Sequence, residues 1–397
     1  MKPKIVAKRL QTLHQTIAPL MHFVNESTWG QREDINQGCD LTFGNPQEMP
    51  IAEYVETLQQ ATTPLDKNWL AYKQNEPEAR AVVCKSLSDY LGHQFEPEDI
   101  FLTNGAIAGL QVGLKTMIDP GDEVIFITPH WFLYEGMIID AGAQPVKVST
   151  DLNTFDLDLE AIKQAISPQT RAIIINSPHN PTGKIYRKDT LSALAQTLTT
   201  ASSNNDRTIY LISDEAYHQV IFDHHQFISP ATIYPQTFLV YTYGKVHLTP
   251  GQRLGFIALP PQMPDRHELR EAINLVQMFA GWSFPNAILQ HGIKNLVKLS
   301  IDIDQIQAIR DRFLDSLTKI GYQTFKPTGT FYLLVKSPIA DDWEFTELLA
   351  QHKVYCLPGI TFGLPGYFRI SLTCNNKMME KSLPKFALAF QVVKENG

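Results

Sequence analysis

The sequence contains few cysteines, and none of them lies close to another. Its 397 residues include only four, Cys39, Cys84, Cys356 and Cys374, and no two of these form a C-x-x-C pair. This spacing indicates neither a zinc ribbon nor a disulfide framework. We therefore expect packed, reduced thiols, no bound metal and a cytoplasmic protein.

Three further absences narrow the classes of function. No apolar run approaches the roughly 18 residues that a membrane-spanning helix needs, so we expect no membrane partner. Lys and Arg number 34 against 41 Asp and Glu, a net charge of −7, and no basic cluster occurs. This balance gives no support to a nucleic-acid partner. No G-x-G-x-x-G follows an expected strand, which argues against plain dinucleotide binding.

The sequence does contain a regular alternation of buried strands and helices. Apolar residues make up 44% of the chain, enough to bury a large core. Seven apolar runs follow residue 98: DIFLT, EVIFIT, AQPVKVS, RAIIIN, TIYLIS, FLVYTY and LGFIALPP. Continuous apolar runs separated by helices are typical of a parallel sheet buried on both faces. The expected fold is α/β, with a three-layer large domain around a mostly parallel seven-stranded sheet.

The ends of the chain differ from this middle part. Past Pro264 long helical stretches appear, with short strands near TFYLLVK, KVYCLPG and YFRISLT, which predicts a smaller α+β domain. The first 24 residues space their apolar side chains as a helix does, which favours a docking helix over a transit peptide. The predicted division is 1–45 as N-terminal arm and part of the small domain, 46–290 as large domain, and 291–397 as small domain.

Residues with chemical potential follow four of the expected strands. Gly105 follows DIFLT, Asn180 follows RAIIIN, Asp214 follows TIYLIS and Lys245 follows FLVYTY. Ligands of parallel α/β sheets bind beyond the carboxyl ends of the strands. We therefore expect these four residues to meet in one pocket.

Each of these residues also has an ordinary structural interpretation. Asn180 could cap a tight loop between two prolines, and Asp214 could be the N-cap of a following helix. Lys245 at a buried strand end is either held in an ion pair or available as a nucleophilic amine. Taken singly, none of them decides the function.

Taken together, they describe a site for a phosphorylated aromatic aldehyde. The helix start in NGAIAG offers free backbone N–H groups to an anion, and Arg253 can grip a phosphate with two hydrogen bonds. Lys245 would bond the aldehyde, and Asp214 would pair with a ring nitrogen. Pyridoxal 5'-phosphate matches this description, and its electron-sink chemistry needs a lysine and an acid in these roles.

The motifs resemble those of the class I/II aminotransferases, fold type I pyridoxal-phosphate enzymes of the aspartate aminotransferase superfamily. NSPHNPTG is similar to the family signature N-P-x-N-P-T-G, and SDEAYHQVIFD to its D-E-x-Y stretch. YGKVHLTPGQRLG keeps the family's lysine-to-arginine spacing of eight residues. PTGTFYLLV and LPGITFGLPGYFRISL match its two small-domain motifs. The resemblance runs from about Asp40 to the C-terminus.

The resemblance implies catalytic roles for three residues. Lys245 would be the Schiff-base lysine and the later proton shuttle, and Asp214 would keep the pyridinium nitrogen protonated. Tyr217, together with Asn180, would hydrogen-bond the phenolate oxygen of the cofactor. Trp131 would stack on the cofactor ring, unless it is an ordinary core tryptophan.

The resemblance also implies the residues that bind phosphate and substrate. The phosphate cradle would consist of Gly105, Ala106, Ile107, Thr242 and Arg253. Arg369 would bind the substrate's α-carboxylate through two hydrogen bonds, and Gly44 would lie against the substrate beside Trp131 and Asn180. Tyr72 would reach the phosphate of the neighbouring subunit in a homodimer, although WLAYKQNEPEAR is about two residues shorter than the usual segment.

The implied activity is transfer of an amino group between an L-amino acid and a 2-oxo acid. A lyase, oxidase or cyclase of amino-acid modification would use the same pocket, and a cofactor-sensing regulator is a remote alternative.

The sequence leaves open which substrate side chain the site accepts. INLVQMFAGWSFPNAILQ lacks Lys and Arg, so Met278, Phe279, Trp282 and Phe284 are either core residues or an apolar rim that favours neutral side chains. Lys67 or Lys73 of the other subunit could instead supply a cation.

Overall fold

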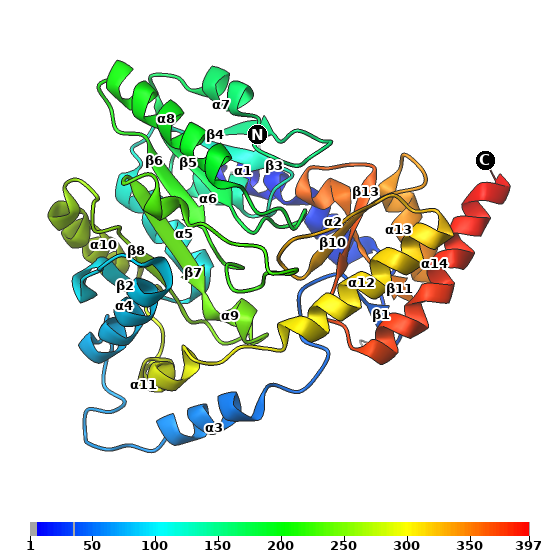
Figure 1. The fold of residues 1–397 in the computed structure, drawn as a ribbon, viewed down its shortest axis with the longest axis horizontal. Helices are drawn as coiled ribbons and strands as arrows, with labels where there is room; N and C mark the ends of the chain where they lie inside the picture. Colours follow the sequence, from blue (N-terminus) through cyan, green and yellow to red (C-terminus); the bar gives the residue numbers. More distant parts are fainter. Residues whose placement is uncertain (1–5, 35, 397) are drawn as a thin grey trace.

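A seven-stranded sheet forms the centre of the larger part of the chain (Figure 1). The computed structural model describes residues 6–34 and 36–396. The strands lie in the order β2-β8-β7-β6-β5-β3-β4. Their bounds are β2 (Ile100–Thr103), β3 (Glu123–Thr128), β4 (Gln144–Ser149), β5 (Thr170–Asn176), β6 (Tyr210–Asp214), β7 (Thr237–Thr242) and β8 (Gly255–Ala258). Each of the seven apolar runs forms one strand, which confirms the expected fold class.

Strand β8 runs opposite to both of its neighbours, and the other strands run in one direction. In the register of the sheet, Gly255 at the start of β8 pairs with Thr242 at the end of β7 and with Thr103 at the end of β2. The carboxyl ends of six strands and the start of β8 therefore share one edge. Arg253, which comes just before β8, lies at the same edge for this reason.

Helices cover both faces of this sheet. In β7, Phe238 and Val240 pack on one side, and Leu239 and Tyr241 pack on the other, because side chains alternate along a strand. The first side carries α5 (Gly105–Met117), α6 (Tyr134–Asp140) and α10 (Arg266–Ala280). The second side carries α4 (Pro77–Leu91), α7 (Leu159–Ala165), α8 (Lys188–Asn204) and α11 (Ala287–Leu296), with α3 (Ala52–Ala61) against α11. The large unit thus has three layers.

A four-stranded antiparallel sheet forms the centre of the smaller unit, at the right of Figure 1. Its order is β12 (Leu357–Pro358), β13 (Tyr367–Ser371), β10 (Tyr332–Lys336) and β9 (Thr324–Phe325). The helices α12 (Ile303–Ile320), α13 (Asp342–Gln351) and α14 (Asn376–Asn396) pack around it. Strand β1 (Cys39–Asp40) pairs with β11 (Val354–Tyr355), so the chain just before Gly44 also joins this unit.

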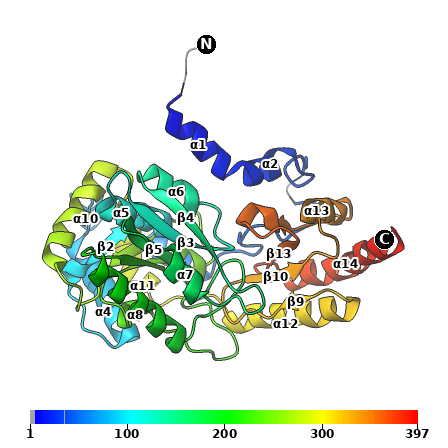
Figure 2. The same cartoon turned by 90° about the horizontal axis from the view of Figure 1, so that it is seen from above.

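The first two helices extend along one side of both units (Figure 2). The expected N-terminal helix is present as two, α1 (Lys8–Thr16) and α2 (Ala18–Glu26), which meet at Ile17. Pro19 in the first turn of α2 accounts for the break, because proline fits a helix start and not its interior. Helix α1 packs on α6, and α2 packs on the small unit, where His22 stacks on Trp343 at 4.2 Å.

The first two helices that follow Pro264 belong to the large unit, since α10 packs on α5 and α11 packs on α3 and α4. Residue 290 lies within α11. The division at residues 45 and 290 stays a prediction, and a cut after α11 would keep that helix with the sheet on which it packs. No helix within 6–34 and 36–396 is long and apolar enough to cross a membrane.

Candidate active site

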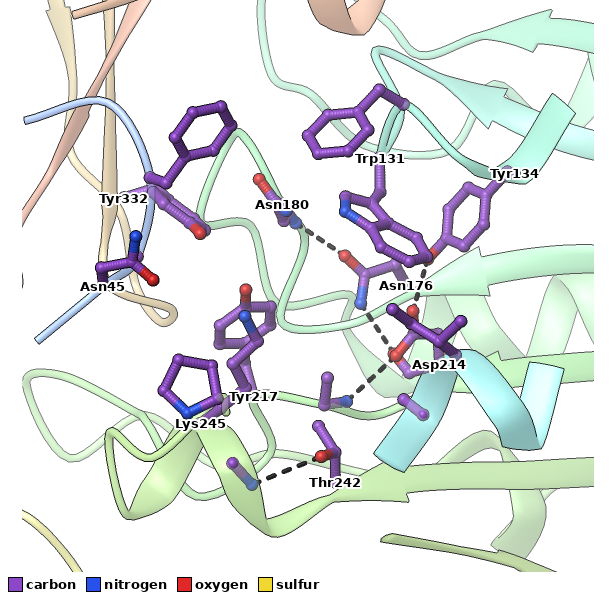
Figure 3. Close-up of a pocket in the computed structure, with 18 of the residues that line it drawn as sticks. Asn45, Trp131, Tyr134, Asn176, Asn180, Asp214, Tyr217, Thr242, Lys245 and Tyr332 are labelled. Carbon is purple, nitrogen blue, oxygen red and sulfur yellow. Dashed lines mark hydrogen bonds between the residues drawn. The ribbon is translucent and has the colours of Figure 1, made fainter. Parts of the chain in front are cut away.

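A cavity of about 280 Å³ lies where the carboxyl edge of the large sheet meets β10 and β13 (Figure 3). It is lined by Phe43, Gly44, Asn45, Ala106, Ile107, Trp131, Phe132, Tyr134, Asn176, Asn180, Asp214, Ala216, Tyr217, Thr242, Gly244, Lys245, Pro250, Arg253, Tyr332 and Arg369. All of the predicted site residues are among these except Gly105 and Tyr72. The four strand ends thus converge on one place.

The carboxylate of Asp214 is buried at the end of β6, and the nearby charge of Lys245 acts on it without forming an ion pair. Tyr134 Oη donates a hydrogen bond of 2.6 Å to Oδ2, and the backbone N–H of Ala216 donates one of 3.2 Å to Oδ1. None of the described Lys, Arg or His residues forms an ion pair with it. Burial raises the pKa of Asp214 above its ordinary value, against the opposing effect of these hydrogen bonds. A protonated ring nitrogen would supply the missing positive charge.

A chain of hydrogen bonds connects β6 to the small unit through two asparagines, and Figure 3 shows its links from Asp214 to Asn176 and from Asn176 to Asn180. Asn176 donates from Nδ2 to the carbonyl oxygen of Asp214 at 2.8 Å, and its Oδ1 accepts from the backbone N–H of Asn180 at 2.7 Å. The side chain of Asn180 then accepts from Arg369 at 2.9 Å. The position of Asn180 in the cavity is therefore fixed from both units.

Arg369 presents a buried positive charge on β13. Its guanidinium donates to Asn180 and to the carbonyl oxygen of Thr42, each at 2.9 Å, and lies 3.8 Å from the ring centroid of Tyr332. Its Nε has no partner, and no carboxylate in the described part of the chain pairs with it. Burial lowers the pKa of this guanidinium. Such a group favours an anionic ligand, because a carboxylate would offset the cost of burying the charge.

The amine of Lys245 projects into the cavity from the short helix α9 (Tyr243–Val246) (Figure 3). Its Nζ lies 5.5 Å from the ring centroid of Tyr217 and 5.6 Å from that of Phe331. It is in no ion pair with a described residue. The hydroxyl of Thr242 caps this helix by accepting from the backbone N–H of Gly244 at 3.3 Å. The amine is thus available for chemistry.

The start of α5 and Arg253 form a second positive region. Gly105 has φ +74°, and a Cβ built on it would lie 2.7 Å from the guanidinium of Arg253, so only glycine lets the two approach. Ala106 and Ile107 follow at a helix start, where backbone N–H groups lack helical partners. The arrangement suits a phosphate.

Of the remaining residues considered in the sequence, some line the cavity and others do not. Gly44 touches the cavity, and a Cβ there would lie 2.7 Å from Tyr332 Oη, which explains the glycine. Tyr72 is fully exposed and does not line the cavity of its own chain. Residues 278–284, for which the sequence left core residues and an apolar rim as alternatives, do not line the cavity of their own chain. Met278 and Phe279 at the end of α10 and Trp282 just beyond it are exposed.

Several lining residues were not anticipated. Asn176 is the last residue of β5 and pairs in register with Asp214, so the strand-end argument could have found it. Tyr134 lies one helical turn beyond Trp131, a spacing that alone gives no reason to choose it. Phe43, Phe132 and Tyr332 read as ordinary core aromatics in the sequence.

The hydrogen bond from Tyr134 to Asp214 yields a testable prediction. In Tyr134→Phe the pKa of Asp214 should rise further, because the bond stabilises the charged carboxylate. The free energy of unfolding at pH 7.5 should fall by about 2 kcal/mol. A carboxyl group whose pKa is higher in the folded than in the unfolded state lowers stability fully above the folded-state pKa, and this cost disappears once the group is protonated in both states. The stability lost in Tyr134→Phe should therefore shrink as the pH falls and Asp214 takes up a proton. Carbon-13 NMR titration and urea unfolding measure the two effects.

Tyr186→Phe is the matched control. This tyrosine is also buried, but its hydroxyl has no hydrogen-bond partner among the described residues. Its removal should leave the pKa of Asp214 and the pH dependence unchanged. Equal behaviour of the two variants would contradict the role given to the Tyr134 hydroxyl.

Known proteins share both the sequence pattern and the fold. The chain is 31% identical over 359 residues to a protein of Thermus aquaticus named probable aspartate/prephenate aminotransferase, covering 88% of this chain and 91% of that protein. The Thermus thermophilus aspartate/prephenate aminotransferase is 30% identical over 361 residues, with the same coverage.

Solved structures agree. An amino transferase from Eubacterium rectale superimposes with a TM-score of 0.86 at 28% identity, covering 98% of this chain and 96% of that one. The aspartate aminotransferase from Thermus thermophilus with maleate gives 0.81 at 27% identity, covering 97% and 100%. The family described as aminotransferase class I and II matches residues 37–386. The chain therefore belongs to the class I and II aminotransferases, enzymes that depend on pyridoxal phosphate.

Proposed function

We propose that this aminotransferase holds its cofactor covalently through Lys245 and moves an amino group between an L-amino acid and a 2-oxo acid in two half-reactions. The observation that carries the assignment is that an amine without an ion-pair partner and a buried carboxylate lie in the same cavity. Lys245 and Asp214 line one cavity, and neither has an ion-pair partner within the described residues. Among the residues that the structure describes, no other lysine lines that cavity.

The residues present fit the cofactor. When bound, pyridoxal phosphate supplies an aldehyde and a ring that withdraws electrons from the substrate's Cα. Asp214 would hold the proton on the ring nitrogen, and Asn180 and Tyr217 would donate to the ring's phenolate oxygen. Trp131 would lie against the ring face. The phosphate would be held by Gly105, Ala106, Ile107, Thr242 and Arg253.

The substrate would be oriented by the small unit. The unpartnered Nε and the outer N–H groups of Arg369 would grip the α-carboxylate, with Gly44 and Trp131 close to the rest of the molecule. The Nζ of Lys245 would then take the proton from the substrate's Cα and return it later. Correct placement of this one proton transfer accounts for much of the expected rate.

The covalent assignment to Lys245 can be tested directly. The purified protein should absorb near about 400 nm, as cofactor-loaded enzymes of this kind do. Borohydride reduction followed by peptide mapping should place the cofactor on Lys245. Lys245→Ala should lose both the label and turnover, while Lys147→Ala, at a surface lysine paired with Glu135, should keep them. A label on any other lysine would overturn the assignment.

Replacement of Arg369 by Lys isolates the carboxylate grip. The variant keeps the charge but loses the planar pair of donors. We expect kcat/KM to fall by about two orders of magnitude, as for the loss of about 3 kcal/mol in a charge-assisted pair, with normal cofactor absorbance. Arg312→Lys, at an exposed pair with Glu380, serves as control and should change little. Loss of cofactor with unchanged substrate affinity would show that Arg369 has another role.

We further propose that the protein is a homodimer in which Tyr72 reaches the partner's phosphate. Tyr72, Leu65 and Leu70 are exposed in the segment 62–76, as are Phe279 and Trp282 on α10 and beyond it. Exposed apolar residues gathered in this way are typical of protein interfaces. Light scattering should give about twice the chain mass, by the usual closed symmetry of such oligomers. A fully active monomer at micromolar concentration would refute the dimer.

We also propose a cytoplasmic location. All four cysteines are free and buried, which suits a compartment that keeps thiols reduced. Cell fractionation tests this, and recovery of the protein from an oxidising compartment would contradict it.

A further inference from the structure

We infer that the amino acid this cavity accommodates best has a neutral, apolar or aromatic side chain and is not a dicarboxylate. The inference rests on the proposed roles of Lys245, Arg253 and Arg369. It concerns the part of the substrate that these residues do not bind.

The first argument counts the cations. Lys245, Arg253 and Arg369 are the Lys and Arg residues that line the cavity within the described chain. Each is already assigned, one to the covalent bond, one to the phosphate and one to the α-carboxylate. A second carboxylate on the substrate would therefore find no unassigned Lys or Arg among the described residues that line the cavity. The remaining charged residue of the lining is Asp214, which would repel it.

The second argument is the nature of the remaining wall. Its apolar and aromatic part includes Phe43, Ile107, Trp131 and Phe132, which come from three separate places in the fold, and the polar residues beside it, Asn45 and Tyr332, are uncharged. The rings of Trp131 and Phe132 lie 5.8 Å apart, and Phe43 packs edge-on against Trp29 at 5.3 Å. These contacts hold the aromatic residues in place, so the wall cannot easily turn a polar group toward the ligand.

The consequence follows from the cost of burying charge. A carboxylate that leaves water for such a wall without a cation is strongly disfavoured. An apolar side chain gains from the same transfer, in proportion to the surface it buries. The cavity should therefore separate the two classes by the chemistry of its wall more than by its size.

Lys67 and Lys73 do not line the cavity of their own chain. They could supply a cation for a distal carboxylate only from a second copy of the chain. Lys73 is already paired with Glu76 at 3.1 Å, and its side chain is 13% exposed. Lys67 lies on the exposed segment 62–76 and, like Lys73, does not line the cavity of its own chain. A cation from either would favour aspartate, and the experiment below detects this outcome. Several relatives are named aspartate aminotransferases, so the inference sets this chain apart from them.

The test uses the cofactor-loaded protein and single half-reactions, followed by cofactor absorbance. Phenylalanine, leucine and methionine should each react with a kcat/KM at least about 100-fold above that of aspartate. Equal or faster reaction of aspartate would overturn the inference while leaving the proposed function intact. If no amino acid reacts, the proposed function and the inference fall together.

Binding of unreactive acids gives a readout that is independent of turnover. By calorimetry, 3-phenylpropanoate should bind the loaded enzyme at least about 10-fold more tightly than succinate. Both carry a carboxylate for Arg369, and they differ in what they present to the wall. Tighter binding of succinate would contradict the inference.

One substitution on the wall sharpens the test. Phe132→Arg adds a cation beside Trp131, and the ratio of kcat/KM for aspartate to that for phenylalanine should rise at least about 10-fold. Phe132→Leu is the matched comparison, since it shortens the side chain but keeps the wall apolar, and its ratio should rise much less than that of Phe132→Arg. An equal rise in both variants would show that space, and not charge, sets the preference.

Discussion

The buried carboxylate of Asp214 is the group around which the site is arranged. A carboxylate out of water and without a cation is costly, so the surrounding fold must hold it charged. Tyr134 and the backbone of Ala216 donate to its oxygens, and Asn176 secures the backbone at the same residue. Two segments distant in the sequence, α6 through Tyr134 and β5 through Asn176, therefore hold Asp214 in place. The desolvation cost that these hydrogen bonds do not offset makes a positively charged ring nitrogen a favoured ligand.

The direction of β8 supplies the complementary charge. Because this strand runs against its neighbours, its first residues lie at the edge where β2 and β7 end. Arg253 thereby stands at the start of α5, next to a glycine that leaves room for it. A sheet with only parallel strands would place this arginine at the opposite edge. One reversed strand therefore brings phosphate binding to the same cavity as Asp214.

Much of this arrangement can be predicted from the sequence, and the parts that cannot have physical reasons. Seven continuous apolar runs predict the sheet because both of its faces are covered, and strand ends then locate Asp214 and Lys245. Tyr134 at the start of α6 could not be predicted, because its partner Asp214 lies 80 residues away at the end of β6 and no local sequence pattern indicates such a contact. For residues 278–284 the sequence left two alternatives open, core residues or an apolar rim, because an apolar stretch does not show which way it faces. Helix α10 buries Ile273 and Gln277 and leaves Phe279 exposed.

The last constraint joins the two units. Arg369 on β13 carries a buried positive charge and Asp214 on β6 a buried negative charge, and neither forms an ion pair within the described part of the chain. They form no ion pair with each other, and Asn180 and Asn176 connect Arg369 to the backbone carbonyl oxygen of Asp214 by hydrogen bonds. A cofactor with a protonated nitrogen and a substrate with a carboxylate would compensate one charge each. Asn180 accepts a hydrogen bond from Arg369 and lines the cavity. A ligand that moves Asn180 would therefore change hydrogen bonds in both units.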